Sequence, residues 1–418
     1  MMNESGHKSG HFDMSISLME PLFPENPQLR ERAQDMVRKT ENLGRHIHAR
    51  TAQAIADILR TVNCYYSNLI EGHETHPIEI ERAMRREYSS KSKERNLQLE
   101  ARAHIEVQIE IEKRISLEPG TNVCSEDFLR WIHNEFYGRL PEEFWIVRNP
   151  KTGQSERVIP GELRHHEVSV GRHIPPIHTN LKEYLARIGD AYNPSRFKDR
   201  SEALVALSAA HHRVLWVHPF GDGNGRVTRL MTDAYLMCIR AGGHGLWTAS
   251  RGFARRRNDY VALLEEADSP RRDNYDGRGS LSNRALMLFC EFFLEICEDQ
   301  IDYMSKLLEV DELAERVLKY GKFRESGSLP GASGNTGKGF DFRPEATKLL
   351  HTLVYRGSVQ RGKIPELLGL EERTSRRVVN FLTDDGFISS KTPKSPLELR
   401  IPAHAGPYFF PGLYEPRT

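Results

Sequence analysis

The sequence predicts a mainly α-helical protein with one short hairpin and a small second domain near its C-terminal end. Apolar residues recur at helical spacing through most of residues 28–318. One stretch, residues 156–176, instead alternates apolar and polar residues after a Pro-Gly turn, as a short hairpin does. A Gly/Ser-rich segment then precedes a final run of short helices.

Length and composition exclude several classes of protein. The 418 residues predict two or three domains. Lys and Arg number 59 against 58 Asp and Glu, a balance that excludes a uniformly basic nucleic-acid coat. The five cysteines show no CxxC spacing, which disfavours a disulfide framework or a zinc ribbon and favours the reducing cytoplasm. No apolar run approaches the roughly 18 residues needed to span a membrane.

Composition and periodicity divide the chain into six parts. We expect a mobile arm, an N-terminal helical region, a core, a flexible linker, a C-terminal helical module and a tail, at residues 1–30, 31–120, 121–322, 323–340, 341–402 and 403–418. Within the core we expect helices over residues 125–137, 181–192, 201–217, 227–241, 250–264 and 283–318. The linker resembles a phosphate-binding P-loop only superficially, because Ala332 and Gly339 occupy positions where Gly and Ser or Thr belong.

The most informative stretch is HPFGDGNGRVTR, residues 218–229, which lies between two predicted helices. Pro219 ends the first helix. Gly223, Asn224 and Gly225 tolerate positive φ, so their backbone N–H groups are expected to form a nest for anionic oxygens. The helix that follows adds its positive N-terminal end.

Charged side chains around this turn complete a phosphate-handling site. Arg226 and Arg229 are three residues apart, so both guanidinium groups can reach one polyphosphate. Asp222 supplies a hard oxygen ligand for Mg²⁺. His218 has a side chain that titrates near neutral pH, as a proton acceptor should. The alternative is an ordinary interhelical turn with solvated charges, which the joint presence of His218, Phe220 and both arginines disfavours.

This stretch resembles, at every defining position, the HxFx[D/E]GNGRxxR signature of Fic-domain proteins. Most characterised members with this signature transfer AMP from ATP to a hydroxyl group of a target protein. The resemblance extends more weakly over residues 125–318 and implies a Fic helical core with a β-hairpin flap. Gly225 stands where the related phosphate-transferring branch carries Lys, so the resemblance favours AMP transfer.

The resemblance assigns roles to individual residues. It implies that His218 deprotonates a Ser, Thr or Tyr hydroxyl, that Asp222 holds Mg²⁺ on the α- and β-phosphates, and that Phe220 anchors the loop. Seven consecutive residues would hold the nucleotide: Gly223, Asn224, Gly225, Arg226, Val227, Thr228 and Arg229. Adenine contacts are expected from Arg256 and Tyr260 on the helix over residues 250–264, although the arginine run there also suits a solvated face.

A second family mark lies upstream. Residues 67–72, SNLIEG, look like the [S/T]xxxE[G/N] inhibitory motif, with Ser67, Glu71 and Gly72 at its defining positions. Because it precedes the catalytic segment, the resemblance implies the subclass with an N-terminal inhibitory helix. A Glu71 carboxylate paired with Arg229 would remove a phosphate clamp. The alternative is a solvated helix end.

The stretch over residues 156–176 corresponds to the family's flap, whose edge holds a target segment by main-chain pairing. We expect Val168–Arg172 to form that edge. Four histidines nearby match no zinc-ligand spacing and are interpreted as loop residues: His165, His166, His173 and His178.

The C-terminal module resembles a winged helix-turn-helix. Its third helix, expected to start near Thr374, would expose Arg373, Arg376 and Arg377 between acidic residues. Both DNA binding and protein docking therefore stay open. The sequence thus predicts an autoinhibited adenylyltransferase that uses ATP and Mg²⁺. Removal of AMP by the same site and a DNA-binding regulator with a nucleotide sensor are the alternatives, and a homodimer is not excluded.

Overall fold

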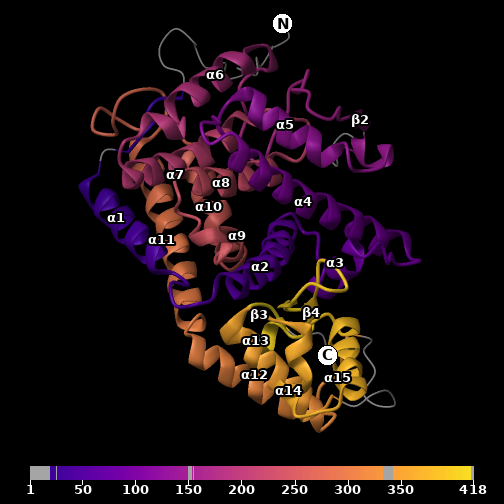
Figure 1. Ribbon diagram of the computed structural model, residues 1–418. Helices are drawn as coiled ribbons and strands as arrows, with labels where there is room; N and C mark the ends of the chain where they lie inside the picture. Colours follow the sequence, from indigo (N-terminus) through magenta and orange to yellow (C-terminus); the bar gives the residue numbers. More distant parts are fainter. Residues whose placement is uncertain (1–18, 25, 149–152, 154, 333–341, 416–418) are drawn as a thin grey trace, which may run out of the picture. The chain divides into compact units, whose positions relative to one another are not determined.

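The computed structural model describes residues 19–24, 26–148, 153, 155–332 and 342–415. It divides into two compact units, each treated separately below. The first contains Met1–Gln34, Ile109–Ile239 and Arg256–Glu295, and the second contains Asp35–Gln108, Arg240–Arg255 and Ile296–Thr418. The mainly helical fold class is confirmed, with short strands in two small sheets of the described residues (Figure 1).

The first unit is built around the consecutive helices α7 and α8. Its helices are α5 (Glu126–Tyr137), α6 (Leu181–Ala191), α7 (Arg200–Val217), α8 (Asn224–Cys238), α10 (Arg257–Ala267) and the first part of α11 (Asn283–Leu307). Helix α7 is buried on almost every side, as a central core helix should be. Ser125 and Asp199 cap α5 and α7 by accepting hydrogen bonds from Phe128 N (3.2 Å) and Ser201 N (2.8 Å).

The predicted hairpin differs from the observed one. Strands β1 (Ile146–Arg148) and β2 (Ser155–Arg157) pair antiparallel, with Ile146 opposite Arg157. Between residues 158 and 176 the described pairing is a single bridge between Val170 and His173. The expectation of one hairpin over residues 156–176 is therefore wrong in position, because a few alternating residues suit an extended loop equally well.

The helix predicted over residues 250–264 is also interrupted. Helix α9 (Ala249–Arg255) ends before Arg256, whose φ of −116° and ψ of 40° break the helical path before α10. The segment expected to be helical over residues 283–318 contains two helices, α11 and α12 (Val310–Glu325). Apolar periodicity continues across such breaks, so it cannot reveal them. In the described parts of the chain, no helix combines the length and the apolar character that a membrane crossing requires.

The second unit joins the N-terminal helices to the C-terminal module. Its helices include α2 (Ala49–Ile70), α3 (Pro77–Met84), α9, α12, α13 (Pro344–Arg356), α14 (Ile364–Leu368), α15 (Glu372–Asp384) and α16 (Gly406–Phe409). Helices α1 (Pro27–Asn42) and α4 (Ser92–Leu117) contribute residues to both units. Strands β3 (Ser358–Val359), β4 (Ile388–Ser389) and β5 (Leu397–Leu399) form an antiparallel sheet in the order β3-β5-β4.

Some expected boundaries shift. Of the predicted N-terminal arm, residues 1–18 lie outside the described residues, whereas Met19 and Leu22 are buried and α1 begins at Pro27. Helix α12 continues to Glu325, into the predicted linker, and residues 333–340 of that linker are not described.

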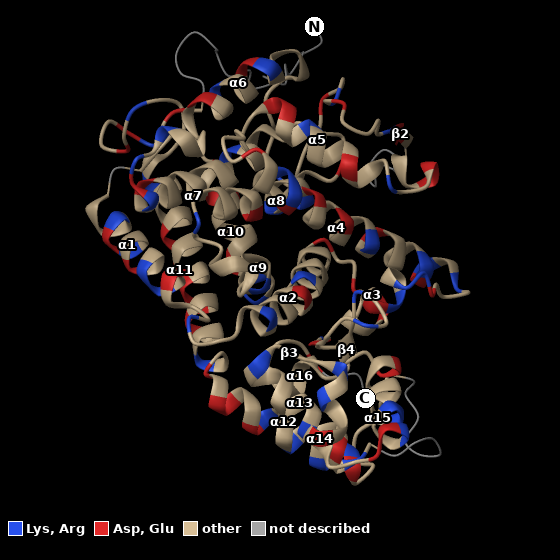
Figure 2. Cartoon of the chain, viewed as in Figure 1, with Lys and Arg blue, Asp and Glu red and all other residues tan. Residues whose placement is uncertain are grey.

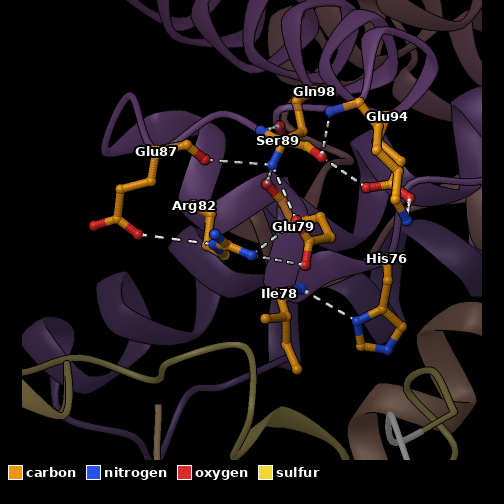
Figure 3. Close-up of polar contacts among 9 residues, drawn as sticks. His76, Ile78, Glu79, Arg82, Glu87, Ser89, Glu94 and Gln98 are labelled. Atoms are coloured by element: carbon orange, nitrogen blue, oxygen red, sulfur yellow. Dashed lines mark hydrogen bonds and ion pairs between the residues drawn. The ribbon is translucent and has the colours of Figure 1, made fainter. Parts of the chain in front are cut away.

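The turn between α3 and α4 is organised by one buried amide. Gln98, 1% exposed, accepts a hydrogen bond from Ser89 N (2.7 Å) and donates one to the carboxylate of Glu79 (3.0 Å), as Figure 3 shows. The Ser89 hydroxyl in turn donates to Glu94 (2.7 Å). A buried amide with both ends satisfied gives the turn a single geometry.

Helix α2 is attached to the C-terminal part of the chain at both ends. Near its start, the Thr51 hydroxyl donates to the carbonyl of Val354 in α13 (2.9 Å). Near its end, the Tyr66 hydroxyl donates to the carbonyl of Leu413 (2.9 Å). The regions predicted as a separate N-terminal helical part and a C-terminal module therefore belong to one compact unit.

Candidate functional site

His218 lies at the end of the buried helix α7. Its backbone is left-handed, with φ 47° and ψ 62°, while its N–H still donates to the carbonyl of Val214 (3.1 Å). Because Pro219 cannot continue the helix, the chain turns here. A left-handed non-glycine residue costs about 1–2 kcal/mol, so the surrounding contacts must hold it. The imidazole is thus attached to a rigid element in one backbone conformation.

The electrostatic surroundings keep this imidazole neutral. Burial lowers the pKa of His218 to about 4, and the nearby charges of Arg164 and His173 act in the same direction. At neutral pH the side chain therefore has an unprotonated nitrogen that can accept a proton.

Asn224 closes the loop that follows. Its Oδ1 accepts a hydrogen bond from Phe220 N (3.0 Å) and its Nδ2 donates to the carbonyl of Phe220 (2.9 Å). The Phe220 ring is fully buried and stacks on the His133 imidazole, with centroids 4.1 Å apart and planes 9° apart. Phe220 is thus placed as an anchor, and the Asn224 side chain shapes the loop.

Gly223 makes the turn into α8. Its φ of 77° is left-handed, and a Cβ there would lie 2.8 Å from Cε2 of Tyr137. Both conditions require glycine. Asn224 and Gly225 instead belong to the first turn of α8, so the expected nest is wrong in detail: the amides at this point are those of a helix N-terminus.

Asp222 is poised as an ionised carboxylate. Burial alone would raise its pKa, but the Arg226 guanidinium and the hydroxyl of Tyr137 hold it below the usual value. The Tyr137 hydroxyl donates to Oδ2 (2.6 Å), and Nη2 of Arg226 lies 3.3 Å from the same oxygen. The Asp222 side chain remains 41% exposed.

An accessible anionic oxygen of this kind fits Mg²⁺. Among the residues that the structure describes, no group of three or more His, Cys, Asp or Glu side chains could hold a metal ion. A Mg²⁺ at Asp222 would therefore depend on phosphate oxygens and water for its other ligands, as is common for this ion.

The remaining motif residues lie along α8. Arg226 is 6% exposed, with its guanidinium 4.9 Å from the Phe136 ring centroid, and Arg229 is 3% exposed. Val227 and Thr228 are buried in the core. Two buried arginines on one turn are not the solvated charges of an ordinary surface turn.

The side chains expected to contact adenine instead contact other side chains of the protein. Tyr260 is buried, and its hydroxyl lies 2.7 Å from Nε2 of His211. Arg256 pairs with Asp259 and Glu295 and lies over the Phe292 ring. The expected adenine role of Arg256 and Tyr260 therefore stays a prediction from the sequence.

The segment expected to dock a target is partly exposed. Val170 is 41% exposed within the single bridge to His173, whose Nε2 lies 2.7 Å from the carbonyl of Trp216. The other three loop histidines each lie near a carboxylate, in the pairs His165–Glu162, His166–Glu156 and His178–Glu167.

The expected inhibitory motif ends α2 in the second unit. Ser67 is buried, Ile70 is the last helical residue, and Glu71 caps the helix with its N–H donated to the carbonyl of Asn68 (3.0 Å). Gly72 follows with a left-handed φ of 84°. The motif therefore lies at an exposed helix end, with Glu71 beyond the last turn.

Three residues of the site escaped the sequence analysis: Tyr137, His133 and Arg164. In the sequence, Tyr137 and His133 look like apolar-face residues of α5, and Arg164 looks like a loop charge. Their roles depend on contacts with a loop 54 to 87 positions further along the chain, for which local sequence offers no signal.

Comparison with known proteins agrees with this geometry. Residues 123–236 match the Fic/DOC family. The protein adenylyltransferase Fic of Drosophila willistoni is 36% identical over 90 residues, which are 22% of this chain and 18% of that protein. Its counterpart in Culex quinquefasciatus is 32% identical over 117 residues, 28% of this chain and 22% of that protein. The chain thus spans about a fifth of the length of these curated relatives.

A solved structure shows that the likeness in fold extends further. The crystal structure of a Fic family protein from Desulfovibrio desulfuricans G20 superposes with a TM-score of 0.51 at 16% identity, covering 91% of this chain and 98% of that one. The predicted resemblance is therefore confirmed at the level of a family match over residues 123–236, together with a similar fold.

Proposed function

We propose that this chain transfers AMP from ATP to a hydroxyl group of a target protein. One arrangement supports the proposal above all: a neutral His218 at a helix end, four residues before an ionised Asp222 and the open N-terminus of α8. A proton acceptor, an anionic metal ligand and a positive helix end are what phosphoryl chemistry requires. The relatives named protein adenylyltransferase Fic share this domain.

In the proposed reaction, the target hydroxyl gives its proton to the imidazole of His218 while its oxygen bonds to the α-phosphorus. The bond from that phosphorus to the bridging oxygen breaks, and pyrophosphate leaves with the electron pair. The N–H groups at the start of α8, with Arg226 and Arg229, bind the phosphates and offset their charge. Mg²⁺ held by Asp222 would supply further charge neutralisation when bound.

We further propose that Glu71 inhibits the transfer, with Ser67 and Gly72 shaping the helix end that carries it. The support is local: α2 ends at Ile70, and Gly72 turns the chain immediately after Glu71. A carboxylate can pair with an arginine that would otherwise bind phosphate. The Val168–Arg172 segment is proposed to hold the target, because Val170 is exposed and the segment is extended enough to form a bridge with His173.

The C-terminal module is proposed to act within the protein or on a protein partner. Its helix order and three-stranded sheet are consistent with the winged helix-turn-helix expected from the sequence. Basic and acidic residues both lie on α15 (Figure 2), and Arg376 pairs with Glu372. This mixture weakens the electrostatic argument for DNA binding.

The test is self-labelling with ATP labelled at the α-phosphate, in the presence of Mg²⁺. Wild type, Glu71→Gly, Glu71→Gly/His218→Ala and Glu71→Gly/His165→Ala are compared. His165 is the matched control because its imidazole is exposed and pairs with Glu162 instead. We expect label in Glu71→Gly and in the His165 variant, and none after His218→Ala. Absence of label from every variant that binds ATP would contradict the proposed transfer.

A further inference from the structure

Arg164 connects three parts of the first unit through one buried guanidinium group. Its side chain is fully inaccessible to solvent. Nε donates to the carbonyl of His218 (2.8 Å), Nη1 to that of His166 (2.9 Å) and Nη2 to that of Pro176. The Arg164 backbone N–H also donates to the carbonyl of Pro219 (2.9 Å). The loop that follows α7 is therefore held from both the backbone and the side chain of one residue.

Only arginine can serve this arrangement. The guanidinium group is planar and carries five N–H donors in a fixed fork, whereas lysine offers a compact charge with three donors at one atom. Three carbonyls that approach from different directions match the fork. A buried charge is tolerated only when hydrogen bonds and counter-charge compensate it, and the carboxylate of Glu167 lies 3.9 Å away.

The contact with His218 acts at a strained position. Carbonyl groups at the end of a helix lack partners within the helix and carry its negative pole. Arg164 supplies both a donor and a positive charge to the last residue before Pro219. This contact holds the left-handed backbone of His218 in place, and that backbone conformation determines the direction of the imidazole.

The two other acceptors bracket the segment proposed to hold the target. His166 and Pro176 stand just before and just after Val168–Arg172, and both carbonyls converge on the same guanidinium group. A shift of the segment as a whole, with both flanking residues, relative to the His218 backbone would therefore break these hydrogen bonds.

We propose that Arg164 is a positioning residue that sets the distance between the His218 imidazole and a target hydroxyl held on Val168–Arg172. This inference rests on the proposed transfer reaction. Arg164 itself is no proton carrier and no phosphate ligand, because its guanidinium donates to backbone carbonyls, those of His218, His166, Pro176 and, at 3.5 Å, Val217. Its effect should fall on the transfer step, since misplacement by about 1 Å can reduce a rate by about 100-fold.

The kinetic test uses Glu71→Gly as the parent. Arg164→Lys in that parent should lower the self-labelling rate at saturating ATP by about 10- to 100-fold. The ATP concentration for half-maximal rate should change less than about twofold, since the phosphate-binding residues are untouched. Arg130→Lys is the matched control: its Nε donates to the carbonyl of Gly161 in the same segment, and its Nη1 pairs with Glu126. Its rate should stay close to that of the parent.

A second measurement does not depend on activity. Hydrogen–deuterium exchange of peptides covering residues 158–176 and 212–221 should become faster in both segments together for Arg164→Lys, but not for Arg130→Lys. Arg164→Gln, which keeps an N–H donor without the buried charge, replaces Arg164→Lys if thermal melting shows that the lysine variant does not fold.

The outcomes separate this inference from the proposed function. An unchanged rate and unchanged exchange in the Arg164 variants would overturn the positioning role. An unlabelled Glu71→Gly parent would count against the transfer reaction alone, and the exchange data would then decide whether Arg164 couples the two segments. A change confined to the ATP concentration dependence would identify Arg164 as a binding residue and contradict positioning.

Discussion

The hydroxyl of Tyr137, at the end of α5, donates a 2.6 Å hydrogen bond to the carboxylate of Asp222. The two residues are 85 positions apart in the chain. The same oxygen of Asp222 lies 3.3 Å from Nη2 of Arg226, and together these contacts keep the carboxylate ionised although burial opposes it. The proposed metal ligand is thus oriented by a residue outside the recognisable motif.

Tyr137→Phe should therefore lower the apparent affinity of the site for Mg²⁺. Loss of the hydrogen bond frees the Asp222 side chain to rotate, so the Mg²⁺ concentration for half-maximal self-labelling should rise about 10-fold. The free energy of unfolding should fall by about 1 kcal/mol, because the carboxylate stays partly solvated. Tyr303→Phe is the control, since its hydroxyl donates to the carbonyl of Pro411 in the second unit. An equal Mg²⁺ requirement in Tyr137→Phe and parent would contradict the orienting role.

Asn224→Asp tests the closure of the loop. The substitution removes the Nδ2 donor and places a carboxylate oxygen against the carbonyl of Phe220, so it should destabilise the protein by about 2 kcal/mol. ATP binding, measured by calorimetry, should weaken because the added negative charge lies at the N-terminus of α8. Asn193→Asp is the control: Oδ1 of Asn193 accepts hydrogen bonds from the N–H and the hydroxyl of Ser195, and Asp accepts them equally well. Equal ATP affinity for the two variants would refute this account.

The pKa of His218 leads to a prediction about activity. Because burial lowers this pKa to about 4, the imidazole stays unprotonated throughout the range from pH 8 to pH 6. The self-labelling rate of Glu71→Gly at saturating ATP should therefore be nearly constant over that range. The ordinary pKa of histidine is about 6.5. A rate that halves near that pH would show that the pKa of His218 is not lowered in the working enzyme.

The same shift has a consequence for stability. The unfolded chain binds a proton at His218 near pH 6.5, whereas the folded chain does so only near pH 4. The free energy of unfolding should therefore fall as the pH is lowered from about 6.5 to about 4, and His133 contributes in the same direction because burial lowers its pKa to about 4. Urea denaturation measures this fall in the free energy of unfolding, which should be smaller for His218→Gln than for wild type. Equal slopes against pH would exclude the contribution of His218.

Tyr66→Phe tests whether the C-terminal part of the chain supports the proposed inhibition. The variant loses the hydrogen bond from the Tyr66 hydroxyl to the carbonyl of Leu413 and so loosens the end of α2 that precedes Glu71. Self-labelling should rise above wild type and stay below Glu71→Gly. Tyr65→Phe, on the same helix, is the matched control and should behave as wild type. Labelling of Tyr66→Phe at the wild-type level would show that this anchor does not restrain α2.

Several features could be predicted from the sequence because a few neighbouring residues decide them. Pro219 ends α7, and the glycine-rich turn precedes α8, since ring sterics and positive φ act within one turn of the chain. The apolar spacing of α7 likewise identifies it as a helix with a buried face. The mainly helical class and the position of the turn between α7 and α8 follow from such local patterns.

The tertiary structure alone decided which donor meets which acceptor. The hairpin begins at Ile146 rather than near residue 156, the helical path breaks at Arg256, and Asn224 turns its amide back to Phe220. Tyr137 reaches Asp222, and Arg164 reaches His218, across 85 and 54 positions. Local sterics encode where helices begin and end, but a buried hydrogen bond forms only once packing has brought its two partners out of water and within 3 Å or so.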